Sequence, residues 1–483
     1  MKMKVRLEWV VVLIAAGVLF EMLFTKPFIG VANNGDFLRV MGAGGIDFLH
    51  VGETAHDQYY GYAHSTYGYG SFQFGGYFSS QIVLVVLASL IGRMLSREVF
   101  DIHVLSAIYS LVMLTAIYVF FKYRPVASGF TTAVLSLLIL FVFFDTAYLA
   151  YFNSFFGEPV SLVFFLLTLS LAFVIVRHPS PSLTLLVFYF IAAGFLACSK
   201  IQNVPIGAAF ALLGLRFLPL QEGRVWRRRV LSLSASLLVL SAGVYLAAPK
   251  ELKHINLYQT VFFGILKDSL HVTTDLHELG LSDELAVLAG TNFFQDDTAI
   301  KQTDPRLQSA FYDNISHKDV MLFYLRHPAR WVSKLEQAAV NSMSIRPYYL
   351  GNFEKSEGQP YGALSYRFSL WSEFKHTYMP NHLWFVVSFY LAYYLIAFIQ
   401  YVRAKLASEK TFIEIFFLIG AVGLFALMIP LLGDGEADLG KHLFLFNVTF
   451  DVMAVSSMGW LLHTAVQLFH RLAAKSRTTG SSF

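Results

Sequence analysis

Apolar runs recur along the whole chain and are separated by short polar stretches. Each run is about 17 to 23 residues long, the length of a helix that crosses roughly 30 Å of hydrocarbon. The pattern therefore predicts an all-α polytopic membrane protein with about ten transmembrane helices. The predicted spans are residues 9–24, 103–121, 129–151, 160–176, 183–198, 204–220, 230–248, 383–401, 412–432 and 443–462.

A further apolar run, residues 82–92, is shorter than the others and follows a stretch rich in Gly, Ser and Tyr. If this run crossed the membrane, Lys122 and Arg124 would lie outside, whereas Lys and Arg near span ends favour the cytoplasmic side. We therefore predict that residues 82–92 form an amphipathic helix at the outer interface of the membrane.

The distribution of Lys and Arg predicts the orientation of the chain. Seventeen of these residues fall in segments assigned to the inside, against two, Lys200 and Lys441, in the short outer loops. By the positive-inside rule, we expect a multi-pass protein of the plasma membrane with both termini in the cytoplasm. No small-x-small cleavage site precedes Thr25, so we expect the first run to be retained as a span.

Two long segments face outward in this topology and divide the chain into three parts. We predict an N-terminal transmembrane module (1–248) that contains the first outer loop (25–102), an extracytoplasmic segment (249–381), and C-terminal helices with a cytoplasmic tail (382–483). In the second outer segment, "LSDELAVLAG" and "KDVMLFYLRHPARWVSKLEQAAVNSM" have helical periodicity. This segment is therefore predicted to be a small helical cap.

Composition removes several classes of protein. Hydrophobic residues make up 56% of the 483 positions, charged residues make up 14%, and the mean hydropathy is +0.56, which together exclude a soluble domain. The single cysteine, Cys198, excludes an intrachain disulfide. The chain has no P-loop, no G-x-G-x-x-G after a strand and no G-x-S-x-G elbow, so neither nucleotide-driven chemistry nor a nucleic-acid partner is expected.

Candidate chemistry gathers in loops at the predicted outer ends of the spans. Short loops at one end of a compact bundle converge, so we expect these side chains to share one outer cavity. A carboxylate there can take a proton from an attacking hydroxyl while a cation holds a lipid phosphate. The candidate residues in these loops are Asp36, Arg39, Glu158, Lys200, Lys441 and His442.

Each candidate also has a purely structural interpretation. Asp36 lies in an Asn-Asn-Gly-Asp cluster and is suited to cap a turn. Glu158 precedes a predicted helix, where a negative charge complements the helix dipole. The side chains of Lys200, Lys441 and His442 could instead reach lipid head groups.

Asp145 and Asp451 fall inside predicted spans, in their outer halves. An ionisable group at such a depth is a functional candidate, but it can also pair within the bundle. His50, His56 and His64 do not have the spacing of metal ligands, so no metal site is inferred.

The arrangement resembles the GT-C superfamily of integral-membrane glycosyltransferases, which includes the protein O-mannosyltransferases and the lipid A aminoarabinose transferases. The shared pattern is a first span that leads into a large outer loop with an acidic residue near its start and interfacial helices. Here "NNGDF" takes the place of the acidic residue and 82–92 that of the interfacial helix. In "NNGDFLR", "YFNSFFGEP" and "GDGEADLGKHLFLFN", the chain is most similar to bacterial cell-surface glycan hexosyltransferases of the S-layer type.

The resemblance implies a hexose donor carried on a polyprenyl phosphate, transfer to a surface glycan or another extracytoplasmic acceptor, and inversion at the anomeric carbon. By position, it implies that Asp36 is the general base on the acceptor hydroxyl and, more loosely, that Glu158 binds acceptor or donor. It leaves the cofactor unknown, because a divalent metal is neither required nor excluded. Lys200, Arg346 and Lys441 are the candidates for binding the donor phosphate. Arg39 and His442 are further substrate-binding candidates.

Two further features bear on the substrate. The chain lacks the W-W-D-type signature of oligosaccharyltransferases, which disfavours protein N-glycosylation. Residues 56–78 are dense in Tyr and Gly, and tyrosine rings can stack on sugars while their hydroxyls bond ring substituents. An aromatic belt at the membrane interface explains the same composition equally well.

Two other functions fit parts of the sequence. A lipid or glycan transporter, or a flippase, requires a series of ionisable residues at mid-membrane, where this chain offers mainly Asp145 and Asp451. A non-catalytic cell-surface assembly protein would use the outer segments as its binding surface. Activity of the purified protein with a polyprenyl-phosphate sugar separates these classes.

Overall fold

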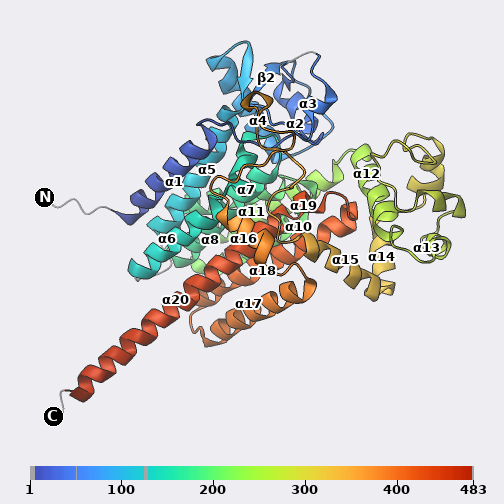
Figure 1. Ribbon diagram of the computed structural model, residues 1–483. Coiled ribbons are helices and arrows are strands. Elements are labelled where there is room, and N and C mark those ends of the chain that lie inside the picture. Colours follow the sequence, from blue (N-terminus) through green and yellow to red (C-terminus); the bar gives the residue numbers. More distant parts are fainter. Residues whose placement is uncertain (1–5, 50–51, 124–128, 481–483) are drawn as a thin grey trace.

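A bundle of long helices forms most of the protein, and a smaller helical part projects from one end of it (Figure 1). The computed structural model describes residues 6–49, 52–123 and 129–480, with side chains up to residue 470. Helices occupy all ten stretches predicted as spans, which confirms the all-α fold. They are α1 (Leu7–Leu23), α5 (His103–Lys122), α6 (Gly129–Phe143), α8 (Glu158–Arg177), α9 (Leu183–Ala197), α10 (Val204–Leu215), α11 (Arg224–Leu246), α17 (Leu383–Arg403), α18 (Ala407–Asp434) and α20 (Phe444–Gly480).

The described part of the chain contains seven helices that are long and apolar enough to cross a membrane, or eight if one bent pair counts as a single span. Of the other predicted spans, α1 has 17 residues and α9 has 15. The number of ten spans therefore stays a prediction. Among the cations used to predict orientation, Lys2, Lys4 and Arg124 lie outside the described residues.

The predicted span 129–151 is not one continuous helix, which corrects the expectation from hydropathy. α6 is followed by a second helical piece that begins with α7 (Thr146–Leu149) and is bent from it by 55°. Asp145 interrupts the helix because its backbone is extended and its carboxylate accepts a hydrogen bond from Ala147 N at 2.8 Å. This bond caps the new helix, so an apolar run is broken by one polar side chain.

The first outer loop combines short helices with a small sheet. α4 (Ser80–Leu95) occupies the stretch predicted as an interfacial helix and packs against α5, whereas its location at the membrane surface stays a prediction. Three strands of two to four residues form an antiparallel sheet in the order β1-β2-β3, too short for the alternation by which sequence identifies strands. The remaining elements are α2 (Leu38–Met41), α3 (Ala55–Gln58), β1 (Ile46–Asp47), β2 (Thr66–Tyr69) and β3 (Val99–Asp101).

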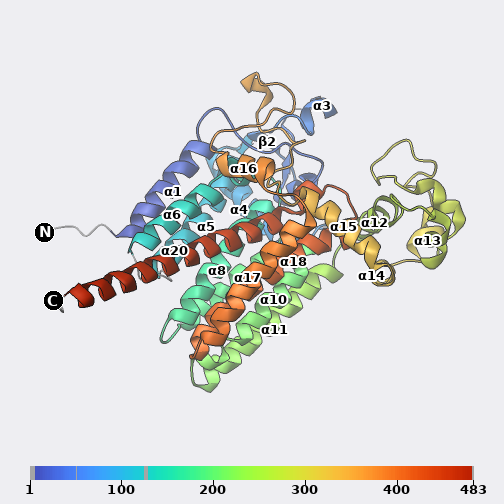
Figure 2. The same ribbon diagram turned by 60° about the horizontal axis from the view of Figure 1, so that its bottom comes forward.

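The second outer segment packs in two different ways. Its first helices enclose a separate hydrophobic core, which runs from Leu257 to Tyr324, and Figures 1 and 2 show this part standing apart from the bundle. The later helices contribute Ala338 and Trp371 to the main core instead. The predicted boundaries at 249 and 381 stay a prediction. The helices are α12 (Lys250–Thr260), α13 (Val272–Glu278), α14 (His317–Arg326), α15 (Pro328–Asn341) and α16 (Leu370–Tyr378).

The two periodic stretches of this segment differ in the structure. The stretch 318–343 is helical up to Asn341, with a break between α14 and α15, where Pro328 begins the second helix. Residues 281–290 contain only a 3₁₀ turn, Asp283–Leu288.

Backbone hydrogen bonds join the two outer segments next to "NNGD". Gly30 N donates to Asn352 O at 2.9 Å, and Gly351 N donates to Tyr60 O at 2.8 Å. A Cβ atom at position 351 would lie 2.0 Å from Gly61 O, so only glycine permits this close approach. The second outer segment therefore holds the backbone that leads into the candidate acidic loop.

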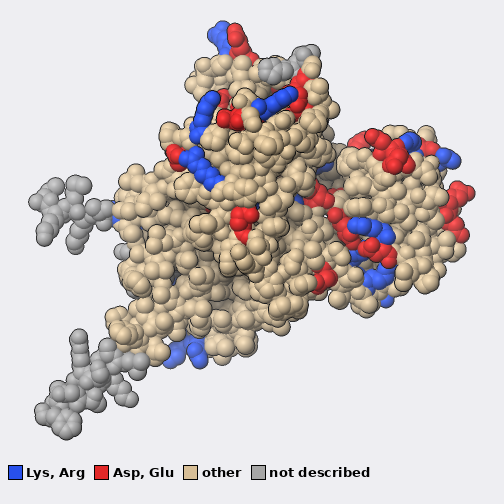
Figure 3. Space-filling model, in the orientation of Figure 1, with Lys and Arg blue, Asp and Glu red and all other residues tan. Residues whose placement is uncertain are grey.

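Charged side chains are distributed unevenly over the surface. On the face shown in Figure 3 they gather on the outer parts, while the surface of the bundle is almost free of them. A large apolar surface of this kind marks contact with lipid rather than water. α1 begins and α20 ends at the same end of the bundle, away from the outer parts (Figure 1).

Candidate active site

The stretch "NNGDF" forms a tight turn after α1. Asn33 Oδ1 accepts hydrogen bonds from Gly35 N at 2.8 Å and from Phe37 N at 3.3 Å. Asn34 Oδ1 accepts one from Asp36 N at 3.2 Å, and Gly35 has a φ of +104°, which residues with a side chain rarely adopt. The two asparagines therefore make the turn, and the carboxylate of Asp36 is left for other partners.

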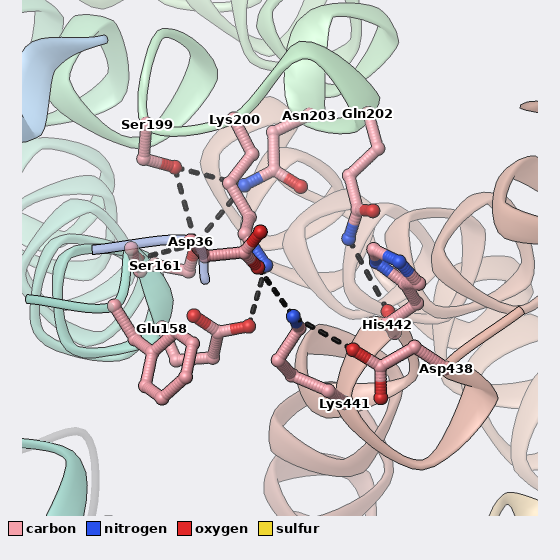
Figure 4. Close-up of polar contacts among 12 residues, drawn as sticks. Asp36, Glu158, Ser161, Ser199, Lys200, Gln202, Asn203, Asp438, Lys441 and His442 are labelled. Atoms are coloured by element: carbon pink, nitrogen blue, oxygen red, sulfur yellow. Dashed lines mark hydrogen bonds and ion pairs between the residues drawn. The ribbon is translucent and has the colours of Figure 1, made fainter. Parts of the chain in front are cut away.

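Lys441 lies between two carboxylates at the centre of the site (Figure 4). Its ammonium forms an ion pair with Asp36 and a second one with Asp438 Oδ2 at 2.7 Å. On its other side, Asp36 Oδ1 lies 3.1 Å from Arg39 Nη2. The side chain of Lys441 is 2% exposed and that of Asp36 is 24% exposed, so a sheltered cation neutralises a carboxylate that solutes can still reach.

The charges of this cluster stabilise one another. Burial acts to raise the pKa of Asp36, but the Lys441 ammonium and the Arg39 guanidinium outweigh it and hold that pKa well below its usual range. Burial acts to lower the pKa of Lys441, but Asp36 and Asp438 outweigh it and raise that pKa well above its usual value. Asp36 is therefore a carboxylate and Lys441 an ammonium ion at neutral pH.

A second ion pair lies beside the first (Figure 4). Glu158 Oε1 is 2.5 Å from Lys200 Nζ, and the charge of Lys200 also acts on Asp36. Glu158 is the first residue of α8 and is 1% exposed; its Oε2 has no hydrogen-bond partner within the described residues. A helix dipole accounts for the position of Glu158, but it does not account for Lys200.

A buried amide and two hydroxyls fix the loop that carries Lys200. Asn203 Nδ2 donates hydrogen bonds to Ser161 Oγ at 3.0 Å and to Ser199 Oγ at 2.9 Å. All three side chains are buried. These bonds tie the start of α10 to α8, and they hold the backbone on both sides of Lys200 in place.

Asp438 belongs to the cluster, although the sequence did not single it out from its acidic loop. Its φ is +48°, in the left-handed region, which is uncommon for a residue other than glycine. Its carboxylate accepts hydrogen bonds from Asn34 Nδ2 at 3.2 Å and from the hydroxyl of Tyr349. Asp438 thus connects the loop before α20 to both outer segments.

Tyr77 brings the Tyr-rich stretch 56–78 to the same place. Burial raises its pKa to about 12, and the charges of Arg39 and Asp36 also act on its hydroxyl. The composition of 56–78 drew attention to tyrosines in general, but it carried no signal for this position.

His442 adjoins the cluster and has its own partners. Its Nε2 lies 3.0 Å from Asp434 Oδ2, and its backbone oxygen accepts a hydrogen bond from Gln202 Nε2 at 3.2 Å. These contacts hold the loop between α18 and α20, which contains Lys441, against the loop after α9. A role of His442 in substrate binding stays a prediction.

The sequence matches the family described as the YfdI N-terminal transmembrane domain over residues 1–480. The chain belongs to this family. Together with its long apolar helices, membership makes it a multi-pass membrane protein. Which side of the membrane holds the termini stays a prediction.

Comparisons with characterised proteins add one likeness. No curated protein matches the sequence. Among solved structures, the chain is similar to the archaeal oligosaccharyltransferase AglB from Archaeoglobus fulgidus in complex with an inhibitory peptide and a dolichol-phosphate, with 15% sequence identity and a TM-score of 0.41. The alignment covers 98% of this chain and 52% of the other, so this chain spans about half the length of that protein.

Arg346 is not part of the cluster in this YfdI-family protein. Its guanidinium donates hydrogen bonds to Ser365 O and to Glu373 Oε1, each at 2.5 Å, and it is 3% exposed. These two partners engage both terminal nitrogens of the guanidinium, while its buried Nε has no hydrogen-bond partner within the described residues. The geometry therefore does not favour a role of Arg346 at the donor phosphate, which stays a prediction.

The two acidic residues predicted inside spans both have partners within the protein. Asp145 accepts hydrogen bonds from Ala147 N and, at 3.0 Å, from Ser372 N. Asp451 is fully buried and accepts three hydrogen bonds. Pairing within the bundle therefore explains both residues. The donors to Asp451 are Lys375 Nζ at 2.6 Å, Tyr148 Oη at 2.6 Å and Trp371 Nε1 at 2.9 Å.

Within the described residues, no group of three or more His, Cys, Asp and Glu side chains could hold a metal ion. The positive charges that the candidate site itself supplies are those of Lys441, Lys200 and Arg39.

Proposed function

We propose that this protein is an inverting glycosyltransferase of the GT-C type, which moves a hexose from a polyprenyl-phosphate donor to a surface glycan or another extracytoplasmic acceptor. The observation that carries the proposal is the buried ammonium of Lys441, held between Asp36 and Asp438 beside the Glu158–Lys200 pair. A carboxylate that can take a proton, beside fixed cations that can hold a phosphate, suits the transfer of a sugar from a lipid phosphate.

The cations suit the leaving group. When the bond between the anomeric carbon and the phosphate oxygen breaks, its electron pair goes to the phosphate, and the polyprenyl phosphate gains one negative charge. Lys441 and Lys200 are largely shielded from solvent. In such a shielded site, fixed cations stabilise the developing negative charge more strongly than they would in water. The donor phosphate then competes with Asp36 for the ammonium of Lys441.

Asp36 suits the acceptor. The acceptor oxygen forms its new bond to the anomeric carbon on the face opposite the phosphate, and its proton passes to the Asp36 carboxylate. Attack from the opposite face inverts the anomeric configuration. Because its pKa is low, Asp36 is ionised before the reaction, and it becomes a stronger base when the phosphate draws Lys441 away.

Tyr77 and Tyr349 suit the sugar. Both bring a ring and a hydroxyl to the cluster, Tyr77 beside Arg39 and Tyr349 through its hydrogen bond to Asp438. Such groups stack on a pyranose face and bond its substituents.

The substitution Asp36→Asn tests the proposal. Asparagine keeps the shape of the side chain and supports turns as well as aspartate does, but it cannot accept the proton. We expect turnover of a polyprenyl-phosphate hexose in proteoliposomes to fall by roughly two to four orders of magnitude, the usual effect of a positioned base. Size-exclusion chromatography checks that the variant is folded.

Asp57 offers a matched control in the same outer loop. Its carboxylate also pairs with a lysine, Lys355, at 2.8 Å, and it lies outside the cluster. Asp57→Asn should therefore leave turnover near that of the wild type. A folded Asp36→Asn protein with wild-type turnover would show that "NNGDF" is a structural turn and not a catalytic loop.

A further inference from the structure

A cavity of about 770 Å³ opens between α5, α6, α8, α17, α18 and α20. It lies in the half of the bundle away from the candidate site. α8 has Glu158 at its site end, and it lines the cavity only from Leu166 to Arg177. α18 lines it from Ser408 to Ile419 and reaches the site only at its opposite end. Figure 2 shows α8, α17, α18 and α20 side by side along this region.

The lining changes along the length of the cavity. The inner end is apolar, with side chains such as Phe143, Leu166 and Ile419. Polar groups gather at the other end, where Arg177, Glu409 and Gln467 form the rim. A long apolar chamber with a few polar groups at one end is the form of a site for an amphiphilic ligand.

The depth of the cavity matches one leaflet of a bilayer. From Leu166 to Arg177 the helix rises by roughly 16 Å, and half of the hydrocarbon core is about 15 Å. The inner end is separated from the candidate site by roughly 12 Å along α8, from Leu166 to Glu158, and by roughly 22 Å along α18, from Ile419 to Asp434. A lipid of the leaflet at this end therefore fits better than the tail of a donor bound at Lys441.

The rim favours an anionic head group. The guanidinium of Arg177 lies over the ring of Phe412, 4.6 Å from its centre. Glu409 is the acidic residue of the rim, and its carboxylate accepts hydrogen bonds from the backbone of Lys405 and Leu406, at 3.0 and 3.1 Å. Arg177 lines the cavity and Lys405 lies outside its lining, and both cations act on this carboxylate electrostatically. Basic pockets between membrane helices on the cytoplasmic side bind anionic lipids.

We propose that this cavity is a binding site for one anionic phospholipid of the cytoplasmic leaflet. Its acyl chain fills the apolar chamber, and its phosphate lies at Arg177. The site is separate from the proposed glycosyl transfer and does not depend on it. The assignment of this end to the cytoplasm rests on the distribution of Lys and Arg.

Retention of lipid by the purified protein tests the proposal. The protein is equilibrated with mixed micelles that contain equal amounts of phosphatidylglycerol and phosphatidylcholine, and retained lipids are counted by native mass spectrometry. We expect one retained phospholipid per chain, with phosphatidylglycerol preferred at least fivefold. In Arg177→Gln, the preference should fall to about the supplied ratio of one. Retention of both lipids in the supplied ratio by the wild type would overturn the proposal.

A substitution that fills the chamber adds a second arm. Gly459 lines the cavity, and a Cβ atom there would lie 3.4 Å from Leu135 Cδ1, so Gly459→Leu places new atoms in the space of the acyl chain. The matched control is Gly243→Leu on α11, where no atom lies within 4 Å of the new Cβ. Gly459→Leu should lose the retained lipid, and Gly243→Leu should keep it. Loss in both variants, or in neither, contradicts the assignment.

Trp460 supplies a readout that does not depend on the folding of Gly459→Leu. Its indole lines the cavity, so phosphatidylglycerol brominated on its acyl chain should quench its fluorescence. The quenched fraction should be larger in the wild type than in the variant Trp460→Phe at saturating lipid. Equal quenching of the two proteins would show that no acyl chain enters the chamber.

Discussion

Lys441 organises the charges of the candidate site. It is almost completely buried, it pairs with Asp36 and Asp438, and the charge of Glu158 also acts on it. Removing its ammonium leaves carboxylates close together with less positive charge to balance them. The function of this residue can therefore be tested through donor binding and through the ionisation of Asp36.

The first prediction at this scale concerns the donor. Lys441→Gln and Lys200→Gln should each weaken use of the polyprenyl-phosphate donor about ten- to a hundredfold, because a charge-assisted contact to phosphate contributes roughly 1.5 to 3 kcal/mol. The measurement is turnover as a function of donor concentration in proteoliposomes. Lys355→Gln, which removes an exposed lysine paired with Asp57, serves as the control and should match the wild type. Unchanged donor use in both cluster variants would remove these lysines from the donor site.

The second prediction concerns pH. Asp36 must be ionised to accept a proton, so activity is lost as pH falls through its pKa. In the wild type, Lys441 and Arg39 hold that pKa well below its usual range against the effect of burial. In Lys441→Gln the effect of burial remains while the strongest opposing charge is gone, so the acid limb of kcat/KM should move to higher pH. An acid limb at the wild-type pH would show that Asp36 does not control it.

Much of this cluster could be predicted from the sequence, and the reason is local. Asp36, Glu158, Lys200 and Lys441 each lie in a loop beside an apolar run, and loops at the same end of a bundle converge. The partners could not be predicted, because the place of Asp438 depends on a left-handed backbone and on contacts with distant segments. The partners of Arg346 could not be predicted either, because they depend on how the long second outer segment folds.

At the scale of elements, α16 is held to the bundle by a buried ion pair. Lys375 on α16 and Asp451 on α20 are both 0% exposed, and their charged atoms are 2.6 Å apart. Ser372 N of the same helix donates to Asp145, at the bend between α6 and α7. A short outer helix is thereby attached to two parts of the bundle that hydropathy alone treats as uniformly apolar.

A double-mutant cycle tests this attachment. Lys375→Met and Asp451→Leu should each lower the free energy of unfolding by roughly 3 to 5 kcal/mol, because each leaves the other charge buried without its partner. The double variant should lose clearly less than the sum, since no charge remains unpaired. Denaturant unfolding in detergent micelles measures the three values. Additive losses would mean that the two charges do not stabilise each other.

An exposed pair provides the comparison for this cycle. Lys355 of the second outer segment pairs with Asp57 of the first, with 2.8 Å between Nζ and Oδ2, but the side chain of Lys355 is 64% exposed. Exposed pairs contribute about 0 to 1 kcal/mol, so Lys355→Met and Asp57→Leu should have small effects. A larger loss of unfolding free energy in the Lys375–Asp451 cycle than in the Lys355–Asp57 cycle would show that burial makes the unpaired charge costly.

The sequence predicted the elements that a long apolar run determines. It did not predict those that depend on a single residue or on the pairing of short strands. All ten apolar runs contain helices, because a helix satisfies its own backbone hydrogen bonds in hydrocarbon. The bend at Asp145 depends on a single capping carboxylate, and strand β1 has only two residues. Neither feature changes the period of the sequence enough to be recognised.

At the scale of the whole molecule, the candidate site lies at one end of the bundle, and the start of α1 and the end of α20 lie at the other (Figure 1). The proposed chemistry requires the site end to face outward. The lipid site inferred in the other half requires that half to adjoin the cytoplasmic leaflet. Both proposals therefore depend on the same orientation, which the distribution of Lys and Arg predicts.

Cysteine labelling tests this orientation. In a Cys198→Ser background, single cysteines are introduced at Ser96, after α4, and at Ser180, between α8 and α9; both positions are exposed. If α4 lies on the outer interface, Ser96→Cys should react with an impermeant thiol reagent added to intact cells. In that case no membrane crossing separates Ser96 from the outer loop that contains Asp36. Ser180→Cys should react only after the membrane is permeabilised, since α8 carries the chain from the site end to the opposite side. The reverse pattern would overturn the ten-span topology. Either the molecule is inverted and Asp36 faces the cytoplasm, or α4 crosses the membrane and every later segment changes side. Labelling of both positions only after permeabilisation would instead show that one of the predicted spans between them, α5, α6 with α7, or α8, does not cross the membrane.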